Sequence, residues 1–132
     1  MEVKTDTKEK FTVIRVKTEE LSATMAAELD HQLQELRKGT PGNIVLNLSD
    51  VKNISEEGAE VLVRTQQKFY DSDLSFVVCE LDKDVEDFLD NNNLLELMNV
   101  TPTESEAFDI VQMEEIEREL LDEEDDPSSP GA

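Results

Sequence analysis

Along the first part of the chain, apolar residues recur first at every second position and then at every third or fourth position. Residues 11–17 place apolar side chains at nearly every second position, the repeat of a β-strand, and residues 1–6 can form an irregular partner strand before it. Between Met25 and Leu36, apolar residues recur every three or four positions, so they occupy one face of a helix. Gly39 then supplies a helix stop. This order predicts two strands followed by a helix.

The middle of the chain continues this alternation of strand and helix. Residues 44–48 form a short β-branched run bounded by turn residues, which predicts a strand covered on at least one face. A helix is expected from residue 56 to about residue 70, followed by a strand over residues 74–80. The positions of this helix that are expected to face inward are Ala59, Leu62, Val63, Gln66 and Phe69.

The last third of the chain is expected to be mostly helical. The expected elements are a helix over 82–89, a helical turn over 94–98 and a small strand over 99–101. Thr103 and Glu106 have the spacing of a capping box, which predicts the start of a final helix. Residues 121–132 are acidic and then rich in Pro and Ser, a composition that buries too little apolar surface to offset the entropy of ordering. We therefore expect a disordered tail there.

Strands that alternate with helices predict an α/β fold. The sheet is expected to carry its helices chiefly on one face. With 132 residues, the chain has room for one domain and a tail, so the domain is placed at residues 1–120.

Charge separates the two halves of the chain. The 33 acidic and 12 basic residues give a formal net charge of −21, and residues 67–132 contain 21 acidic but only 3 basic side chains. Such a field repels nucleic acid and anionic membranes, so the expected partner is a protein with a basic surface. No apolar run approaches the ~18 residues of a bilayer span, and the first residues lack the apolar stretch of a secretory signal. A cytoplasmic protein without membrane insertion is expected.

The residues offer no catalytic, cofactor or metal constellation. Cys79 lies within an apolar run and is expected to be buried, and a nucleophile would need a histidine base. The one histidine, His31, lies in a polar stretch and is expected at the surface. Carboxylate pairs are frequent, but none is flanked by the histidine or apolar pocket that tunes acid–base catalysis. We therefore expect a protein without enzymatic activity, metal or cofactor.

The junction that follows residues 44–48 is the most informative segment. Ser55 is suited to be a helix N-cap, whose hydroxyl accepts a hydrogen bond from the first turn. Glu56 and Glu57 would lie in that turn, where each carboxylate gains about 0.3–1 kcal/mol from the helix dipole. Gly58 would allow the helix to approach neighbouring backbone closely. Helix stability alone accounts for these residues.

The same junction resembles the signature turn of the STAS domain family, the family of the anti-sigma-factor antagonists. The resemblance extends over residues 3–120 and includes residues 76–79 and 85–89. It implies an α/β sandwich with a mixed sheet of roughly four to five strands and helices mainly on one face. In that family, a serine or threonine in an Asp-Ser-Ser-Gly-like turn is phosphorylated to switch partner binding. By this resemblance, Ser55 stands at the position of the aspartate and Glu56 at that of the phosphoacceptor.

The resemblance also implies a protein partner. An anti-sigma factor or a kinase-like ATPase would dock on the turn and on the outer face of the helix that follows. The residues expected to contact this partner are Asn53, Ile54, Ser55, Glu56, Glu57, Gly58, Glu60 and Arg64.

Several alternatives stay open. A permanent carboxylate at position 56 makes the protein either a constitutive binder or a locked mimic of the phosphorylated state. Ser55 is a second candidate phosphoacceptor, displaced by one position. The same fold would also suit an accessory subunit of a membrane lipid ABC transporter. An acidic carrier protein, which would be a helical bundle, is the candidate from another class. The oligomeric state is not readable from the sequence.

Overall fold

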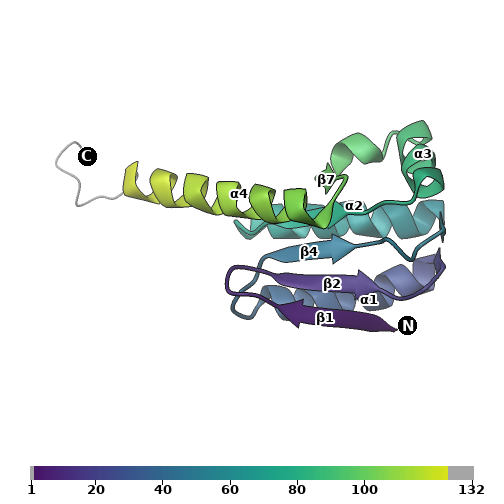
Figure 1. The fold of residues 1–132 in the computed structure, drawn as a ribbon, viewed down its shortest axis with the longest axis horizontal. Coiled ribbons are helices and arrows are strands. Elements are labelled where there is room, and N and C mark those ends of the chain that lie inside the picture. The colour runs from purple at the N-terminus through teal and green to yellow at the C-terminus, as the bar shows by residue number, and fades with distance from the viewer. Residues whose placement is uncertain (1, 125–132) are drawn as a thin grey trace.

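A mixed β-sheet packed between helices forms the centre of the molecule (Figure 1). The computed structural model describes residues 2–124. Its strands are β1 (Val3–Thr7), β2 (Thr12–Val16), β3 (Glu20–Leu21), β4 (Ile44–Asn47), β5 (Asn53–Ile54), β6 (Phe76–Cys79) and β7 (Val100–Thr101). Its helices are α1 (Ala23–Arg37), α2 (Glu56–Asp71), α3 (Lys83–Asn91), the 3-10 turn η1 (Leu95–Leu97) and α4 (Glu104–Glu124).

The central sheet has five strands in the order β1-β2-β4-β6-β7. β1 runs antiparallel to β2, and the other neighbours are parallel. Because β2, β4 and β6 run in one direction, their carboxyl ends lie at the same edge of the sheet. β3 and β5 form a separate parallel pair beside it. The expected α/β fold with a mixed sheet is confirmed.

Alternate side chains of the central strands build two hydrophobic cores. In β4, Ile44 and Leu46 belong to the core shared with α1, α2 and α3, whereas Val45 belongs to the core shared with α4. All three are fully buried. Because helices cover both faces of the sheet, its strands read as continuous apolar runs. In Figure 1, α4 passes in front of the sheet while α1 and α2 lie behind it. Because α3 packs into the same core as α1 and α2, most helices lie on one face, as expected, and α4 alone of the described helices covers the other.

Two ionisable side chains hold α4 to the edge at which β4 and β6 begin. The Ser75 hydroxyl donates to Oε1 of Glu114 (2.6 Å), and Nη1 of Arg118 donates to the Ser75 oxygen (3.2 Å). The buried Asn43 side chain accepts at Oδ1 from the main-chain N–H of Ser75 (2.8 Å) and from Arg118 (3.4 Å). Glu114 and Arg118 are one turn apart, so one face of α4 is fixed against the sheet.

The inward face of α2 needs one correction. Three of its expected inward residues are buried, but Val63 and Gln66 are only half-buried, and Thr65 is fully buried. The Thr65 hydroxyl lies 2.7 Å from Oδ1 of Asp30 and 2.9 Å from the main-chain oxygen of Val61. These contacts give the buried Thr65 hydroxyl its hydrogen-bond partners. A prediction from apolar residues alone does not place a threonine in the core.

The remaining local expectations concern single residues and the tail. Cys79 is buried and His31 is exposed, as predicted. The main-chain N–H of Glu106 donates to the Thr103 hydroxyl (3.1 Å), which confirms the predicted cap of the last helix. Of the expected tail at 121–132, α4 includes the first residues, and 125–132 lie outside the described residues. Within residues 2–124, no helix has the length and apolar character that a membrane span requires.

Candidate functional site

The turn before α2 is positioned by the small parallel sheet. Leu21 of β3 pairs with Ile54 of β5, and both side chains are buried in the core beneath α1 and α2. The main-chain N–H groups of Lys52 and Asn53 also donate to the carbonyl of Glu19 (2.7 and 3.0 Å). The chain therefore enters α2 from a fixed strand rather than from a free loop.

Ser55 is the N-cap of α2, as predicted. Its backbone is extended (φ −78°, ψ 159°), and its hydroxyl accepts a hydrogen bond from the main-chain N–H of Gly58 at 2.9 Å. Its own main-chain N–H donates to the carbonyl of Leu21 (3.2 Å). The cap satisfies one of the N–H groups that the start of a helix leaves without a partner.

Gly58 fulfils the expectation of a close backbone approach. A Cβ at this position would lie 2.7 Å from the carbonyl oxygen of Leu21 and 3.0 Å from the Ser55 hydroxyl. Real Cβ atoms do not come so close to a main-chain oxygen, so a side chain here would push α2 away from β3. The absence of a side chain lets the first turn of α2 rest on β3.

The structure divides the predicted contact residues into two groups. Ile54 and Gly58 are buried and shape the turn from below. Ser55 is half-buried. The residues exposed on the outer surface of the turn and of α2 are Asn53, Glu56, Glu57, Glu60 and Arg64. Two of these side chains, Glu56 and Glu57, are carboxylates in the first turn of α2.

A shallow hollow of about 390 Å³ lies beside the turn. Its walls come from β3 and β5 and from the N-caps of two helices, Ser22 of α1 and Ser55 of α2. The Ser22 hydroxyl accepts from the main-chain N–H of Met25 (3.3 Å). Sequence reasoning missed Glu20 and Ser22 as members of this surface. A serine directly before the periodic residues of the first helix was the available signal for Ser22.

An ion pair joins the turn to α3. Nζ of Lys52 lies 3.2 Å from Oδ2 of Asp82, the N-cap of α3. Oδ1 of Asp82 accepts from the main-chain N–H of Asp84 (3.0 Å). The backbone hydrogen bond from Asp84, followed by the contact with Lys52, lowers the pKa of Asp82. The starts of α2 and α3 are thus linked through charged residues at the same edge of the molecule.

The single cysteine has no feature of a nucleophile. Burial, followed by the charges of Glu104 and Glu80, raises the pKa of Cys79 to about 12. The thiol is therefore protonated at neutral pH. In the part of the chain that the structure describes, no three His, Cys, Asp or Glu side chains form a group that could hold a metal ion.

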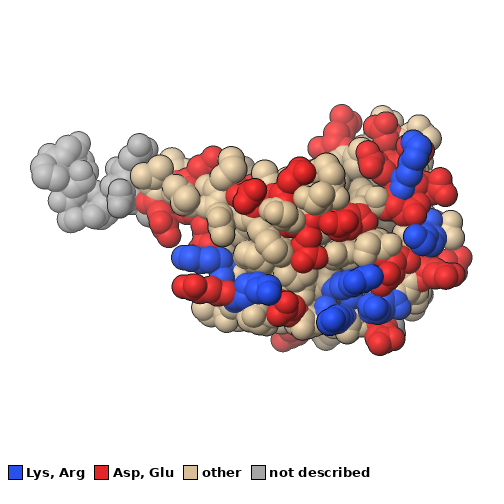
Figure 2. Space-filling view, viewed as in Figure 1, with Lys and Arg blue, Asp and Glu red and all other residues tan. Residues whose placement is uncertain are grey.

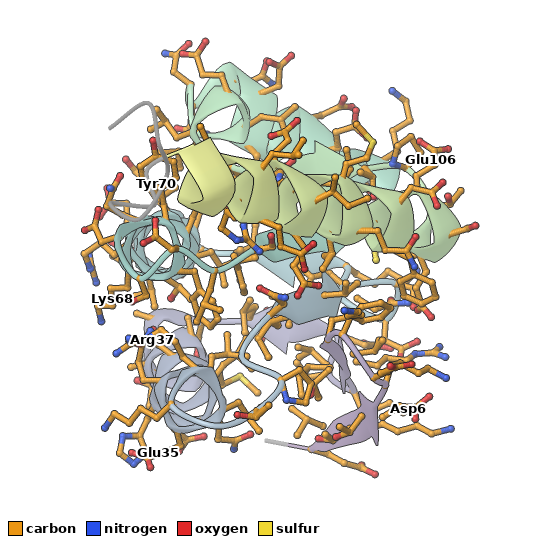
Figure 3. All side chains as sticks on the ribbon, turned by 90° about the vertical axis from the view of Figure 1, so that its left-hand side faces the viewer. Asp6, Glu35, Arg37, Lys68, Tyr70 and Glu106 are labelled. Atoms are coloured by element: carbon orange, nitrogen blue, oxygen red, sulfur yellow. The ribbon has the colours of Figure 1, made fainter. Side chains whose placement is uncertain are left out.

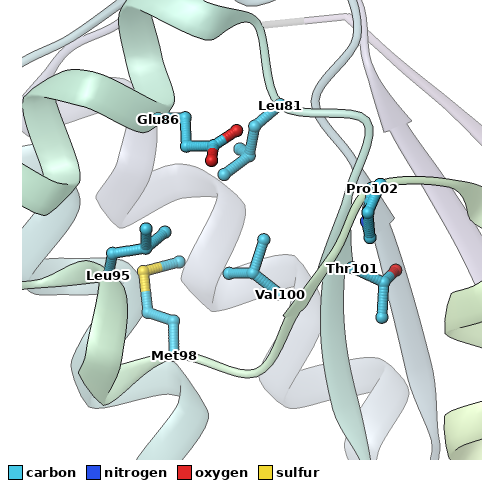
Figure 4. Close-up of a pocket in the computed structure, with 7 residues that line it drawn as sticks. All are labelled: Leu81, Glu86, Leu95, Met98, Val100, Thr101 and Pro102. Atoms are coloured by element: carbon cyan, nitrogen blue, oxygen red, sulfur yellow. The ribbon is translucent and has the colours of Figure 1, made fainter.

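A second hollow, of about 380 Å³, lies between α3, η1 and β7 (Figure 4). Among the seven residues that line it, the single titratable side chain is Glu86. A lone carboxylate provides no acid–base pair. The other lining residues are Leu81, Leu95, Met98, Val100, Thr101 and Pro102.

The family is decided by a match that covers most of the chain. The model of the STAS domain matches residues 2–107. The chain belongs to the STAS domain family. In this STAS protein, the residues expected to form the signature turn lie between β5 and the first turn of α2. A comparison with curated protein sequences gave no match.

Solved structures of this fold include several anti-sigma factor antagonists. A candidate anti-sigma factor antagonist from Thermotoga maritima is 24% identical, with a TM-score of 0.70 over 83% of this chain and 94% of that one. An anti-sigma-factor antagonist (STAS) domain protein from Planctomyces limnophilus is 18% identical, with a TM-score of 0.71 over 83% and 97%. An anti-sigma factor antagonist from Mycobacterium paratuberculosis is 19% identical, with a TM-score of 0.70 over 84% and 93%. At these identities the likeness shows the fold.

Proposed function

We propose that this STAS protein is a non-enzymatic interaction module that docks an anti-sigma factor or a kinase-like ATPase through residues 53–58. The proposal rests chiefly on the exposed carboxylate of Glu56, the first residue of α2, directly after a structured N-cap. In this proposal Glu56 occupies the position at which relatives carry a phosphorylatable hydroxyl.

The charge of Glu56 is permanent, whereas a phosphate is added and removed. A phosphoserine carries about 1.5–2 negative charges at neutral pH, and a carboxylate carries about one. The N-terminus of α2 favours negative charge, so Glu56 and Glu57 are stable there without a partner. The surface is therefore poised for a basic patch on the partner, and its affinity does not depend on a kinase acting at position 56.

In this proposal Ser55 is the N-cap of α2 and not the phosphoacceptor. Its hydroxyl is half-buried and accepts from the N–H of Gly58. Phosphorylation there would have to displace or rebuild the cap. Of the other candidate functions, a helical-bundle carrier protein is contradicted by the five-stranded sheet. An accessory subunit of a lipid ABC transporter would use the same fold. The test below distinguishes this function by binding to a transporter ATPase subunit.

The test measures binding of the full chain to each purified anti-sigma or kinase-like protein encoded in the source genome. Glu56→Lys is expected to weaken one of these complexes by about tenfold or more, because it reverses the charge at the centre of the surface. Glu9→Lys is the matched control. Glu9 is exposed and lies in the turn before β2, whereas the 53–58 turn follows β4, so the two positions are at opposite ends of the sheet (Figure 1).

Two further results distinguish a constitutive binder from a mimic of the phosphorylated state. If Glu56→Ser becomes phosphorylated by the bound kinase and then dissociates, wild type is a constitutive binder whose switch has been removed. If wild type binds weakly and unphosphorylated Glu56→Ser binds tightly, Glu56 is a mimic of the phosphorylated state. Equal binding by wild type and Glu56→Lys would contradict the proposal, as would binding confined to a transporter ATPase subunit.

A further inference from the structure

Exposed large apolar side chains gather at the C-terminal half of α4. Six such residues are exposed within the described part of the chain, and four of them lie on α4 between its middle, at Met113, and Leu121. A fifth, Tyr70 near the end of α2, is 73% exposed. We call these five residues the α4 patch: Tyr70, Met113, Ile116, Leu120 and Leu121. Such a concentration on one side of a small protein is typical of an interaction surface.

The geometry of α4 explains why these side chains face outward. Ala107, Val111, Glu114 and Arg118 turn one face of the helix to the sheet. With 3.6 residues per turn, positions 113, 116 and 120 fall together on the opposite face. The helix thus has two apolar faces: one is covered by β4 and β6, and the other is open to solvent.

Leu121 extends the patch from α4 to α2. It lines a groove of about 360 Å³ together with Tyr70, Leu74 and Phe76. Figure 3, viewed from the end at which α4 projects, shows Tyr70 on α2 beside the last turns of α4. β7 pairs with β6 at Val78 and Cys79, so no strand among residues 2–124 covers β6 at Phe76 on this side. The apolar lining residues of the groove form a strip beside the outward face of α4, and the polar lining residues include Gln66, Glu114 and Arg118.

Acidic residues surround this strip. Glu117 and Asp73 line the groove, and Asp109 and Glu119 are exposed on α4. Within residues 104–121 there are seven acidic side chains and one basic one, Arg118, which is already hydrogen-bonded at the sheet edge. In Figure 2, red side chains alternate with tan ones over α4, whereas blue ones gather over β1 and β2.

This charge distribution selects among possible occupants. A second copy would bring two acidic helices together, and an anionic membrane would be repelled. A helix with leucine-like anchors every three or four residues and lysine or arginine on its flanks matches both the apolar strip and the acidic border. We infer that the α4 patch is a second docking surface, which takes a basic amphipathic helix of a protein partner.

The second surface is separate from the turn at residues 53–58. Glu56 and Tyr70 lie near opposite ends of α2, about 20 Å apart at the rise of an α-helix. The inference does not depend on the proposed function, because no residue belongs to both surfaces. A STAS protein with two such surfaces could hold two partners at once.

The test uses the full chain, labelled with ¹⁵N, and a synthetic amphipathic helix of about 18 residues built from leucine and lysine. The peptide is expected to shift amide resonances of residues 112–121 and of Tyr70. The double variant Ile116→Ser/Leu120→Ser should weaken binding about tenfold or more. Leu97→Ser is the matched control, because Leu97 is an equally exposed leucine outside the patch. Glu56→Lys should bind the peptide like wild type.

Four results would overturn the inference. The first is equal binding of a peptide in which glutamate replaces lysine. The second is a loss of affinity in Leu97→Ser as large as in the double variant. The third is a set of shifts centred on residues 53–58. The fourth is self-association in analytical ultracentrifugation that the double variant abolishes, which would make the patch an interface between copies. Circular dichroism of each variant checks that the fold is retained.

Discussion

The main-chain oxygen of Leu21 occupies the space in which a side chain at Gly58 would begin. A Cβ on Gly58 would lie 2.7 Å from that oxygen. The same oxygen accepts a hydrogen bond from the main-chain N–H of Ser55 (3.2 Å). One carbonyl of β3 therefore sets both the entry to α2 and the depth at which its first turn sits. Glu56, two positions before Gly58, is exposed in the same turn.

Gly58→Ala is expected to lower the free energy of unfolding by about 2 kcal/mol. The new methyl group would meet a main-chain atom that cannot rotate away, and this cost exceeds the gain of up to about 1 kcal/mol from helix propensity. Urea unfolding followed by circular dichroism measures the change. Gly39→Ala is the control, because the nearest neighbour of its Cβ would be the Leu36 oxygen at an ordinary contact distance of 3.5 Å. Equal stability of the two variants would show that β3 moves away from the new methyl group at little cost in free energy.

Ser55→Ala is expected to destabilise the protein by about 1 kcal/mol, because the N–H of Gly58 loses its side-chain acceptor. Ser55→Asp should keep most of the stability, since aspartate is an equally good N-cap. Thermal and urea unfolding of both variants make the comparison. A Ser55→Ala protein as stable as wild type would mean that the cap contributes nothing in this context.

Asp30→Asn is expected to lower the free energy of unfolding by about 1 kcal/mol at neutral pH. Desolvation would raise the pKa of Asp30, but hydrogen bonds from Thr65, Gln34 and Lys68 outweigh it and leave the pKa lowered. The ionised group therefore stabilises the fold above its unfolded pKa of about 4, and this contribution is lost as the pH falls through the lower folded value.

The difference between wild type and Asp30→Asn should accordingly shrink in acid. Urea titrations between neutral pH and about pH 3 test this. Asp109→Asn, at an exposed position on α4, controls for the change in net charge. A difference that stays constant across this range would show that the amide is poorly accommodated for a steric reason.

Cys79 is expected to react with a thiol reagent at least about a hundredfold more slowly in the folded protein than in urea. Its side chain is fully buried and its pKa is raised to about 12, so neither access nor thiolate is available at neutral pH. Release of the chromophore from an aromatic disulfide reagent follows the reaction. A fast reaction without denaturant would indicate that α4 frequently moves away from the core that it shares with β4 and β6, which contains Cys79.

Elements with a clear local signal could be predicted from the residues alone. The periodic helices, the apolar strands and the cap at Ser55 each depend on neighbours within a few positions, and all are present as expected. The two-residue strands β3 and β5 had no such signal, because two residues show no period and the partners are more than thirty positions apart. The burial of Thr65 also escaped prediction, since its partner Asp30 lies on another helix.

The order of the residues by itself determined the α/β class, the helix starts and the permanent negative charge at position 56, because these follow from periodicity, capping chemistry and side-chain identity. Only the tertiary structure decided which predicted contact residues reach the surface and how α4 is oriented. That orientation depends on Ser75, Glu114 and Arg118, which come together from distant segments. The same packing leaves one apolar face of α4 without cover, because a helix with two apolar faces can turn only one of them to the sheet.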